Sequence, residues 1–297
     1  MEDTSWIDEV LVTAQNVRRR GSEVCIANNG GYLVQVCSSA EILVTLFSRL
    51  MDLGPSSGPM VPAQFEGVPR PGEPALIGSI YSGNRDRFLL SPAHYALGLY
   101  STLVEMGRLS DDVLNLANAD GSTLEMIGAE HSPGFATTAG SLAQTLSVAI
   151  GQALALKRRA EPHRVWTLIS DGELEEGQTW EALQVASNFE LGNLTVYLDA
   201  NGLQVDGWVK DVMQIEPIAE KVRAFGWDVI EVDGHDPEQL WAAGNEPSDG
   251  RPRLVVCRTQ PYRGIPSLKD RHQLHYIRFR SGEVETLRRD LSALQGV

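Results

Sequence analysis

Short apolar runs alternate with longer amphipathic stretches along most of the chain. Five runs are short and rich in β-branched, aromatic or leucine residues, which is typical of buried strands: 87–90, 165–169, 194–198, 227–232 and 253–258. Helical spacing of apolar residues predicts helices over, or within, seven further segments: 4–20, 38–53, 95–107, 138–157, 215–225, 236–244 and 283–295. Strands that alternate with helices in this way predict an α/β fold, a mainly parallel sheet with helices on both faces.

Proline and glycine are dense between residues 54 and 78, which predicts a long loop or insertion. The helix over 38–53 is expected to be capped by Ser38 or Ser39. The chain has no internal repeat and no clear linker. We therefore expect one domain over residues 1–297.

Composition narrows the function classes. The 297 residues are 42% hydrophobic and 22% charged, which is ordinary for a globular protein. A net charge of -14 disfavours nucleic acid and anionic membranes as partners. No apolar stretch is expected to reach the roughly 18 residues of a membrane span, and we do not expect the acidic amino terminus to act as a secretion signal. The three cysteines are scattered, as in a reducing compartment, so we expect a cytoplasmic protein.

Two polar side chains follow two successive predicted strands. Asp171 comes after the run 165–169, and Asn201 comes after the run 194–198. Parallel strands open on the same edge of a sheet, which is where α/β proteins bind ligands. A carboxylate and an amide that converge there suit Mg²⁺, which takes its remaining ligands from water or phosphate oxygens.

This stretch resembles the diphosphate-binding motif of thiamine-diphosphate enzymes, and within that group the amino-terminal half of transketolase. The family pattern runs from GDG through EG and EA to D-x-N-G and DG. Ser170 replaces the first glycine, which is compatible with a turn of negative φ. The matching positions are Asp171-Gly172, Glu176-Gly177, Glu181-Ala182, Asp199, Asn201-Gly202 and Asp206-Gly207.

The resemblance assigns roles to these residues. Asp171, Asn201 and the Leu203 carbonyl would bind Mg²⁺, or Ca²⁺ or Mn²⁺ in its place. Gly172 and Glu173 would lie against thiamine diphosphate, with a helix from near Glu176 directing its amino terminus at the diphosphate. The family also places Glu176 and Glu181 in a buried acidic relay between the two active sites of a dimer.

Two further stretches carry family motifs that contain histidine. Residues 85–94, RDRFLLSPAH, are similar to a motif that precedes the diphosphate site, so His94 would contact the cofactor. Residues 130–144, EHSPGFATTAGSLAQ, are similar to a second motif, in which His131 would face the substrate carbonyl. The backbones of Gly140 and Leu142 would then lie against the cofactor, and Ala143 replaces a usual glycine. Imidazoles suit proton transfer to carbonyl substrates near neutral pH.

Two positions stay open. A family histidine near the carboxyl end corresponds to His275, as a catalytic and cofactor-binding residue, or to His272. An early family histidine has no counterpart: depending on the direction of counting, Tyr32 or Gly31 takes its place. A tyrosine, with an ordinary pKa of about 10, is a poor proton shuttle at neutral pH, so an unusual donor or acceptor is expected. Tyr32 could equally be a core residue.

The resemblance covers nearly the whole chain but only half of a full-length transketolase. This chain is therefore expected to lack the pyrimidine-binding domain, with the glutamate that activates the cofactor in this family. We therefore expect a subunit of a split enzyme, active only with a separate pyrimidine-domain subunit in an α2β2 heterotetramer. It would transfer a two-carbon ketol or acyl unit between small carbonyl or sugar-phosphate substrates through a thiamine-bound carbanion. The alternatives are a component that decarboxylates 2-oxo acids, of the acyloin-forming or dehydrogenase type, and a non-catalytic relative.

Overall fold

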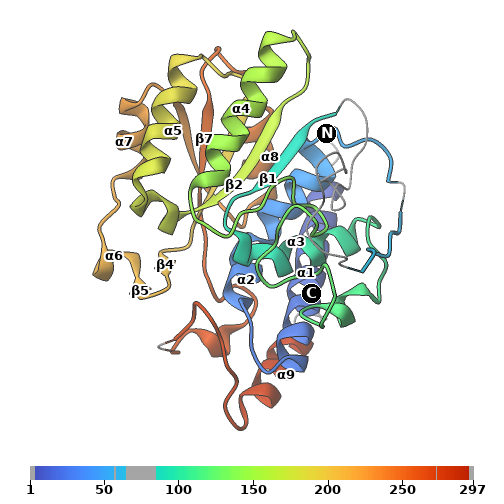
Figure 1. The fold of residues 1–297 in the computed structure, drawn as a ribbon. Coiled ribbons are helices and arrows are strands. Elements are labelled where there is room, and N and C mark those ends of the chain that lie inside the picture. The colour runs from blue at the N-terminus through green and yellow to red at the C-terminus, as the bar shows by residue number, and fades with distance from the viewer. Residues whose placement is uncertain (1–3, 57, 65–84, 272, 294–297) are drawn as a thin grey trace.

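A computed structural model describes residues 4–56, 58–64, 85–271 and 273–293. The centre of the fold is a parallel sheet of five strands in the order β1-β2-β3-β7-β6 (Figure 1). Each of the four strand pairs in this sheet is parallel, so the sheet is of the predicted type. The strands are β1 (Arg87–Leu90), β2 (Val165–Ser170), β3 (Leu194–Ala200), β6 (Asp228–Asp233) and β7 (Arg253–Arg258).

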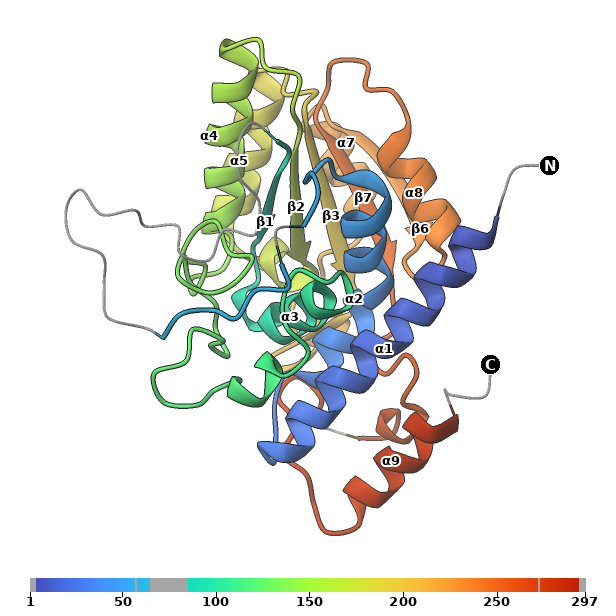
Figure 2. The ribbon, with the colours of Figure 1, turned by 90° about the vertical axis from the view of Figure 1, so that its right-hand side faces the viewer.

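Helices cover both faces of the sheet, as Figure 2 shows. On one face lie α4 (Gln144–Arg158), α5 (Gly177–Asn188) and α7 (Ile218–Ala224). On the other face lie α2 (Leu33–Thr45), α3 (Ala96–Glu105) and α8 (Pro237–Asn245). The long helix α1 (Ser5–Ala27) packs against α2 and α3. The α/β fold with helices on both faces is therefore confirmed.

Alternation along the strands explains the two layers. In β3, Leu194, Val196 and Leu198 belong to the core under α4, α5 and α7. Tyr197 points to the opposite core, because successive strand residues face opposite sides of a sheet. Both faces are apolar, as expected for a parallel sheet covered on each side.

Shorter elements complete the chain. An antiparallel hairpin of two short strands follows β3 and leads into a short helix, neither of which was predicted. The hairpin consists of β4 (Leu203–Gln204) and β5 (Gly207–Trp208), and the short helix is α6 (Val209–Val212). The remaining elements are the π-helical η1 (Leu46–Leu50), the 3-10 turns η2 (Ala93–Tyr95), η3 (Val113–Leu116), η4 (Asp171–Glu175) and η5 (Pro266–Leu268), and the helix α9 (Glu283–Ala293).

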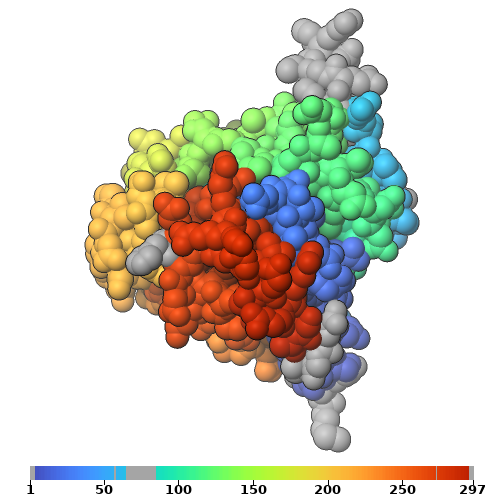
Figure 3. All heavy atoms as spheres, turned by 90° about the horizontal axis from the view of Figure 1, so that it is seen from below, coloured from blue at the N-terminus to red at the C-terminus, as the bar shows by residue number. Residues whose placement is uncertain are grey.

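The segment after β7 returns to the amino-terminal helices. Gly31 and Ile277 exchange two backbone hydrogen bonds of 2.9 Å, and α9 packs into a third core with α1 and α2. Seen from below in Figure 3, this segment lies between the β4–β5 region and α1. Residues 273–277 are thereby brought beside the carboxyl edge of the sheet.

Most predicted boundaries agree with the structure, and two were wrong. The first helix runs to Ala27 rather than residue 20. The second begins at Leu33, so Ser38 and Ser39 lie inside it, where the Ser39 hydroxyl donates to the Gln35 carbonyl at 2.6 Å. Residues 65–84, most of the predicted loop, are outside the described residues, and the single-domain assignment stays a prediction.

One segment has the length and apolar character of a membrane-crossing helix, contrary to the expectation from sequence. It spans Leu33–Leu50 with a mean hydropathy of 1.4, but 83% of it is buried in the fold. Burial against the sheet and α1 accounts for its apolar composition equally well, so it is weak evidence for a membrane span.

Candidate active site

Asp171 and the turn after β3 meet at the carboxyl edge of the sheet. The Asp171 carboxylate follows β2 directly and is 2% exposed. It accepts a hydrogen bond from the Gly202 backbone N–H at 2.6 Å and one from Gly172 N–H at 2.9 Å. The expected convergence of the two strand ends is therefore present in the fold.

Asn201 presents its amide from the neighbouring strand. Its Oδ1 accepts a hydrogen bond from the Leu203 N–H at 2.8 Å, within the turn that leads into β4. Its Nδ2 donates to Asp199 Oδ2 at 3.1 Å and to the Tyr95 hydroxyl at 3.1 Å. The amide is thus held on both sides, close to the backbone of Leu203.

The electrostatics of this edge suit a divalent cation. Burial, and secondly the neighbouring Asp199 carboxylate, raise the pKa of Asp171 well above its usual range. Asp199 is fully buried, and in the part of the chain that the structure describes neither acid forms an ion pair. Buried charges are normally paired or bound to metal. A carboxylate, an amide oxygen and a backbone carbonyl match the hard oxygen ligands of Mg²⁺.

The described residues contain no cluster of three histidine, cysteine or acidic side chains that could hold a metal. The candidate site does not depend on such a cluster, because two of its ligands are uncharged oxygens. Gly172 also leaves room beside it: an added Cβ would meet only the Gln204 Cβ, at 3.6 Å. Because no neighbouring protein atom requires a glycine at this position, the glycine is consistent with close approach of a ligand to the backbone.

Ser170, which replaces the first family glycine, has a φ of -104°, so the turn accepts it as expected. The side chain of Glu173 differs from the expectation of a cofactor contact. It is fully buried, and its oxygens accept from the Ser91 hydroxyl, from Ala143 N–H at 2.8 Å and from Ser170 N–H at 2.9 Å. The Glu173 side chain therefore holds the loop before α4, and only its backbone is left for the cofactor.

That loop carries Gly140 and Leu142, which were expected to lie against the cofactor. Ala143, the residue that Glu173 holds, has a left-handed φ of 66° at the start of α4. Glycine adopts this φ without strain, whereas alanine does not. The replacement of the family glycine by alanine therefore costs more than the small difference in side-chain size suggests. The roles of Gly140 and Leu142 remain predictions.

Four rings gather beside the sheet edge. The Tyr32 ring lies 5.2 Å from His94, 5.5 Å from His275 and 5.0 Å from Tyr276, measured between ring centroids. His94 and His275 are 5.0 Å apart. The structure thus places the side chain of Tyr32 among the predicted site histidines, while His272 lies outside the described residues.

The two histidines of this cluster are uncharged at neutral pH. Burial, reinforced by His275, lowers the pKa of His94 to about 3, and burial lowers the pKa of His275. Gln35 Nε2 is 3.2 Å from His275 Nδ1 and donates to the His275 carbonyl at 3.1 Å. Because Gln35 presents N–H groups, Nδ1 accepts and the imidazole proton resides on Nε2. Burial also raises the pKa of the Tyr32 hydroxyl.

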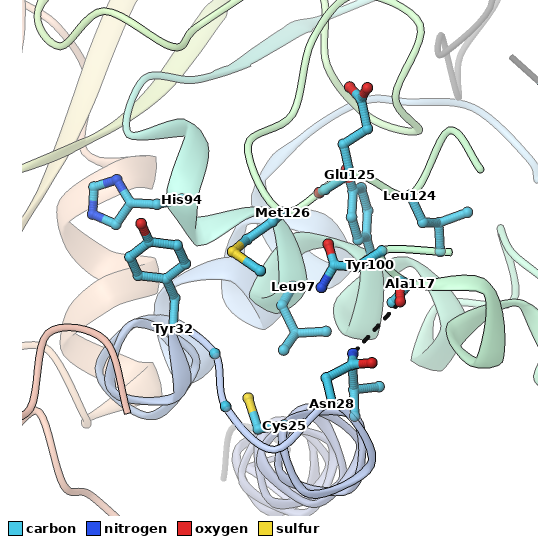
Figure 4. Close-up of a pocket in the computed structure, with 14 residues that line it drawn as sticks. Cys25, Asn28, Tyr32, His94, Leu97, Tyr100, Ala117, Leu124, Glu125 and Met126 are labelled. Carbon is cyan, nitrogen blue, oxygen red and sulfur yellow. Dashed lines mark hydrogen bonds between the residues drawn. The ribbon is translucent and has the colours of Figure 1, made fainter. Parts of the chain in front are cut away.

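Figure 4 shows a small pocket lined by Tyr32 and His94, with the Tyr32 hydroxyl directed toward the His94 ring. Leu97, Met126 and Asn28 line the other parts of this pocket. A second hollow of about 410 Å³ is lined by residues 203–207 and 273–276. The ring cluster contributes to both, so it lies between them.

His131 forms a pair that the sequence did not suggest. Its Nε2 lies 2.7 Å from Glu125 Oε2, and the Ser132 hydroxyl donates to the same oxygen at 3.3 Å. Glu125 also lines the pocket of Figure 4. The role of His131 toward substrate remains a prediction.

Glu176 and Glu181 lie at the start of α5, and both are exposed in this chain. A buried relay would need another chain over them, so the relay remains a prediction. Sequence reasoning missed Ser38, Tyr95 and Thr259, which all donate to Asp199. They come from three separated segments, so local spacing gave no signal.

Sequence comparison gives a family match over most of the chain. The family described as "Transketolase, thiamine diphosphate binding domain" matches residues 79–294. A transketolase family protein of Sinorhizobium fredii, y4mO, is 36% identical over 89% of this chain and 88% of its own. The "6-deoxy-6-sulfo-D-fructose transketolase subunit SqwG" of a Clostridium species is 32% identical over 77% and 76%. An apulose-4-phosphate transketolase subunit of Actinobacillus succinogenes is 30% identical over 94% of each.

Solved structures share the fold. Transketolase from Campylobacter jejuni superposes with a TM-score of 0.77 at 22% identity. A Pichia stipitis transketolase mutant in complex with fructose 6-phosphate gives 0.75 at 23% identity. These matches cover 97% and 96% of this chain but only 43% and 40% of those proteins.

Proposed function

This chain belongs to the transketolase family, and we propose that it is the diphosphate- and Mg²⁺-binding subunit of a split transketolase-like enzyme. The enzyme would transfer a two-carbon ketol or acyl unit between small carbonyl or sugar-phosphate compounds. Bound thiamine diphosphate supplies the nucleophilic carbon and the electron sink, while the protein binds and orients it.

The observation that carries this proposal is the convergence of Asp171 and Asn201 at the carboxyl edge of the sheet. The Gly202 N–H bonds the Asp171 carboxylate at 2.6 Å, which brings the end of β2 and the turn after β3 together. Asp171, Asn201 and the Leu203 carbonyl would hold Mg²⁺, which in turn would bind the diphosphate oxygens. Gly172 would allow the diphosphate to approach the backbone.

The uncharged histidines supply hydrogen-bonding groups next to this edge. His275 keeps its proton on Nε2, because its Nδ1 is occupied by Gln35. We assign His94 and His275 to the cofactor and substrate, and His131, oriented by Glu125, to the substrate carbonyl. A neutral imidazole both donates and accepts, as reversible proton transfer requires.

The pyrimidine-binding half would be carried by a separate chain. Relatives of nearly the same length are named as subunits, and this chain spans 40–43% of the transketolases whose fold it shares. Glu176 and Glu181 would become buried on assembly, as an α2β2 heterotetramer would require. A cytoplasmic location, expected from the free buried Cys25, Cys37 and Cys257, stays a prediction.

Calorimetric titration of thiamine diphosphate and Mg²⁺ into this chain, alone and with a pyrimidine-domain subunit, tests the proposal. Binding should be weak for the chain alone, tight with the partner and absent for Asp171→Ala. Asp211→Ala is the matched control, because it removes an exposed acid from the nearby α6. Unchanged binding by Asp171→Ala would refute the metal assignment, and activity without any partner would refute the split enzyme. No binding in any combination would indicate a non-catalytic relative.

One observation supports a second candidate, a component that decarboxylates 2-oxo acids. Tyr32 stands among His94 and His275, where the family carries an early histidine. A phenol with a raised pKa transfers protons poorly at neutral pH. Proton transfer to and from the usual ketose donor would therefore be less efficient at this position. Donor screening of the reconstituted complex separates the two: hydroxypyruvate or ketose phosphates for a ketol transferase, pyruvate for the alternative.

A further inference from the structure

Asp199 is a buried carboxylate with no assigned role. It lies in β3 next to Ser170 of β2, and none of its surface is exposed. Its Oδ2 accepts hydrogen bonds from the Ser38 hydroxyl at 2.5 Å, the Tyr95 hydroxyl at 2.8 Å and Asn201 Nδ2 at 3.1 Å. The Thr259 hydroxyl donates to Oδ1. All four donors are neutral, so their hydrogen bonds hold the carboxylate without cancelling its charge.

These contacts fix the orientation of the Asn201 amide. Its Nδ2 faces acceptors at Asp199 Oδ2 and the Tyr95 hydroxyl, while its Oδ1 faces the Leu203 N–H at 2.8 Å. In the flipped amide, Oδ1 would meet the Asp199 carboxylate, and Nδ2 would meet the N–H of Leu203. Both contacts would be repulsive, so only one orientation is permitted.

We propose that Asp199 is a positioning residue that directs the Asn201 amide oxygen to the cation at Asp171. This inference rests on the proposed function, because it gives Asn201 its role as a metal ligand. Asp199 acts through hydrogen-bond geometry: it fixes the nitrogen of the amide so that the oxygen faces the metal. Partners that orient metal ligands in this way influence affinity strongly.

The same carboxylate links the cation site to the histidine cluster. Tyr95 follows His94 in η2, Ser38 lies in α2 and Thr259 follows β7. Asp199 therefore joins three segments that are distant in sequence to the ligand turn after β3. Loss of the Asp199 acceptor oxygens would release the Asn201 amide and also the hydroxyl of Tyr95, the residue after His94.

Binding of Mn²⁺ with inorganic diphosphate to the full chain tests the proposal by electron paramagnetic resonance, without any activity assay. Asp199→Leu removes every acceptor and should weaken Mn²⁺ affinity by about 10- to 100-fold. Asp199→Asn retains one oxygen for Ser38, Tyr95 and Asn201, and its amide can donate to Thr259. It should therefore restore the affinity to within a few-fold of the unmodified chain.

The matched control is Asp86→Leu. Asp86 is also buried and accepts from Trp166 Nε1 at 2.8 Å, Arg164 N–H at 2.9 Å and Asp52 N–H at 3.1 Å, but it lies just before β1, at the opposite edge of the sheet. Its loss should lower stability and leave the Mn²⁺ affinity of the folded chain unchanged. If Asp199→Leu likewise lowers stability but leaves the Mn²⁺ affinity of the folded chain unchanged, the role of Asp199 is purely structural and the proposal is overturned.

Two further outcomes are decisive. If Asp199→Asn loses as much affinity as Asp199→Leu, charge rather than positioning is responsible, and the proposal is wrong. If Asp199→Leu does not fold, hydrogen exchange of the Asn201 side-chain amide in the unmodified chain replaces it: slow exchange supports the proposal and fast exchange refutes it. Failure of the unmodified chain to bind Mn²⁺ would instead refute the proposed metal site itself.

Discussion

Glu41 is the anion of a buried cluster that joins α1, α2 and the loops after β6 and β7. Its carboxylate contacts the Arg18 guanidinium and lies 3.0 Å from His235 Nδ1. Gln260 N–H donates to His235 Nε2 at 2.9 Å, so the imidazole proton resides on Nδ1 and is donated to Glu41. Replacement of Glu41 by glutamine keeps the shape and removes the charge.

The structure gives the magnitude of this change. Burial alone would raise the pKa of Glu41, but Arg18 and His235 lower it from 4.5 to about 2. At 1.36 kcal/mol for each pKa unit, that difference corresponds to roughly 3 kcal/mol of stability. Removal of one partner from a buried ion pair typically costs about 3–5 kcal/mol, which agrees. Glu41→Gln should therefore lower the free energy of unfolding by about 3 kcal/mol at pH 7.

Urea denaturation of the isolated chain is the assay. Glu23→Gln is the control, because Glu23 pairs with Arg19 on the exposed surface of α1 and should cost less than about 0.5 kcal/mol. The folded pKa of Glu41 is depressed, so its contribution is present above pH 4.5 and is lost as the pH falls toward 2. Equal costs for the two variants, or a Glu41→Gln deficit that persists undiminished near pH 2, would refute the reasoning.

Three other predictions follow from single residues. His94 is protonated below about pH 6.5 in the unfolded chain but only near pH 3 in the native chain, so the free energy of unfolding falls as the pH drops through this window. In urea titrations, His94→Gln should reduce the slope of the free energy of unfolding against pH by up to about 1.4 kcal/mol per pH unit. Gly134→Ala should cost clearly more than Gly107→Ala in thermal denaturation: both have positive φ, but an added Cβ meets Leu99 at 2.9 Å at the first and nothing within 4 Å at the second. Burial raises the pKa of Cys25 and Cys37 to about 12, so a thiol reagent should modify them only after unfolding, and rapid labelling of the native chain would contradict the fold.

The sequence predicted the sheet well because its strands are buried on both faces. The run 87–90 coincides with β1, and 253–258 coincides with β7. Such strands are continuous apolar segments between turn residues, and their signal is local. The residues that directly follow a strand are also recognisable from nearby sequence. Asp171 and Asn201 could therefore be assigned to one sheet edge before the fold was known.

Other features required the tertiary structure. Ser38 and Ser39 have the chemistry of helix caps, but burial of the preceding residues against the sheet and α1 extends the helix to Leu33. Glu173 stands in the cofactor motif, yet the loop before α4 and the end of β1 occupy its oxygens. In each case a contact made by a distant segment outweighed the local preference.

The sequence itself, through strand ends and motif spacing, predicted the candidate ligand-binding edge of the sheet. Only the tertiary structure placed the ring of Tyr32 beside His94 and His275, and showed that Asp199 holds the amide of Asn201. The physical reason is that local structure depends on neighbours in sequence, whereas ring contacts and buried hydrogen bonds depend on which distant segments packing brings together.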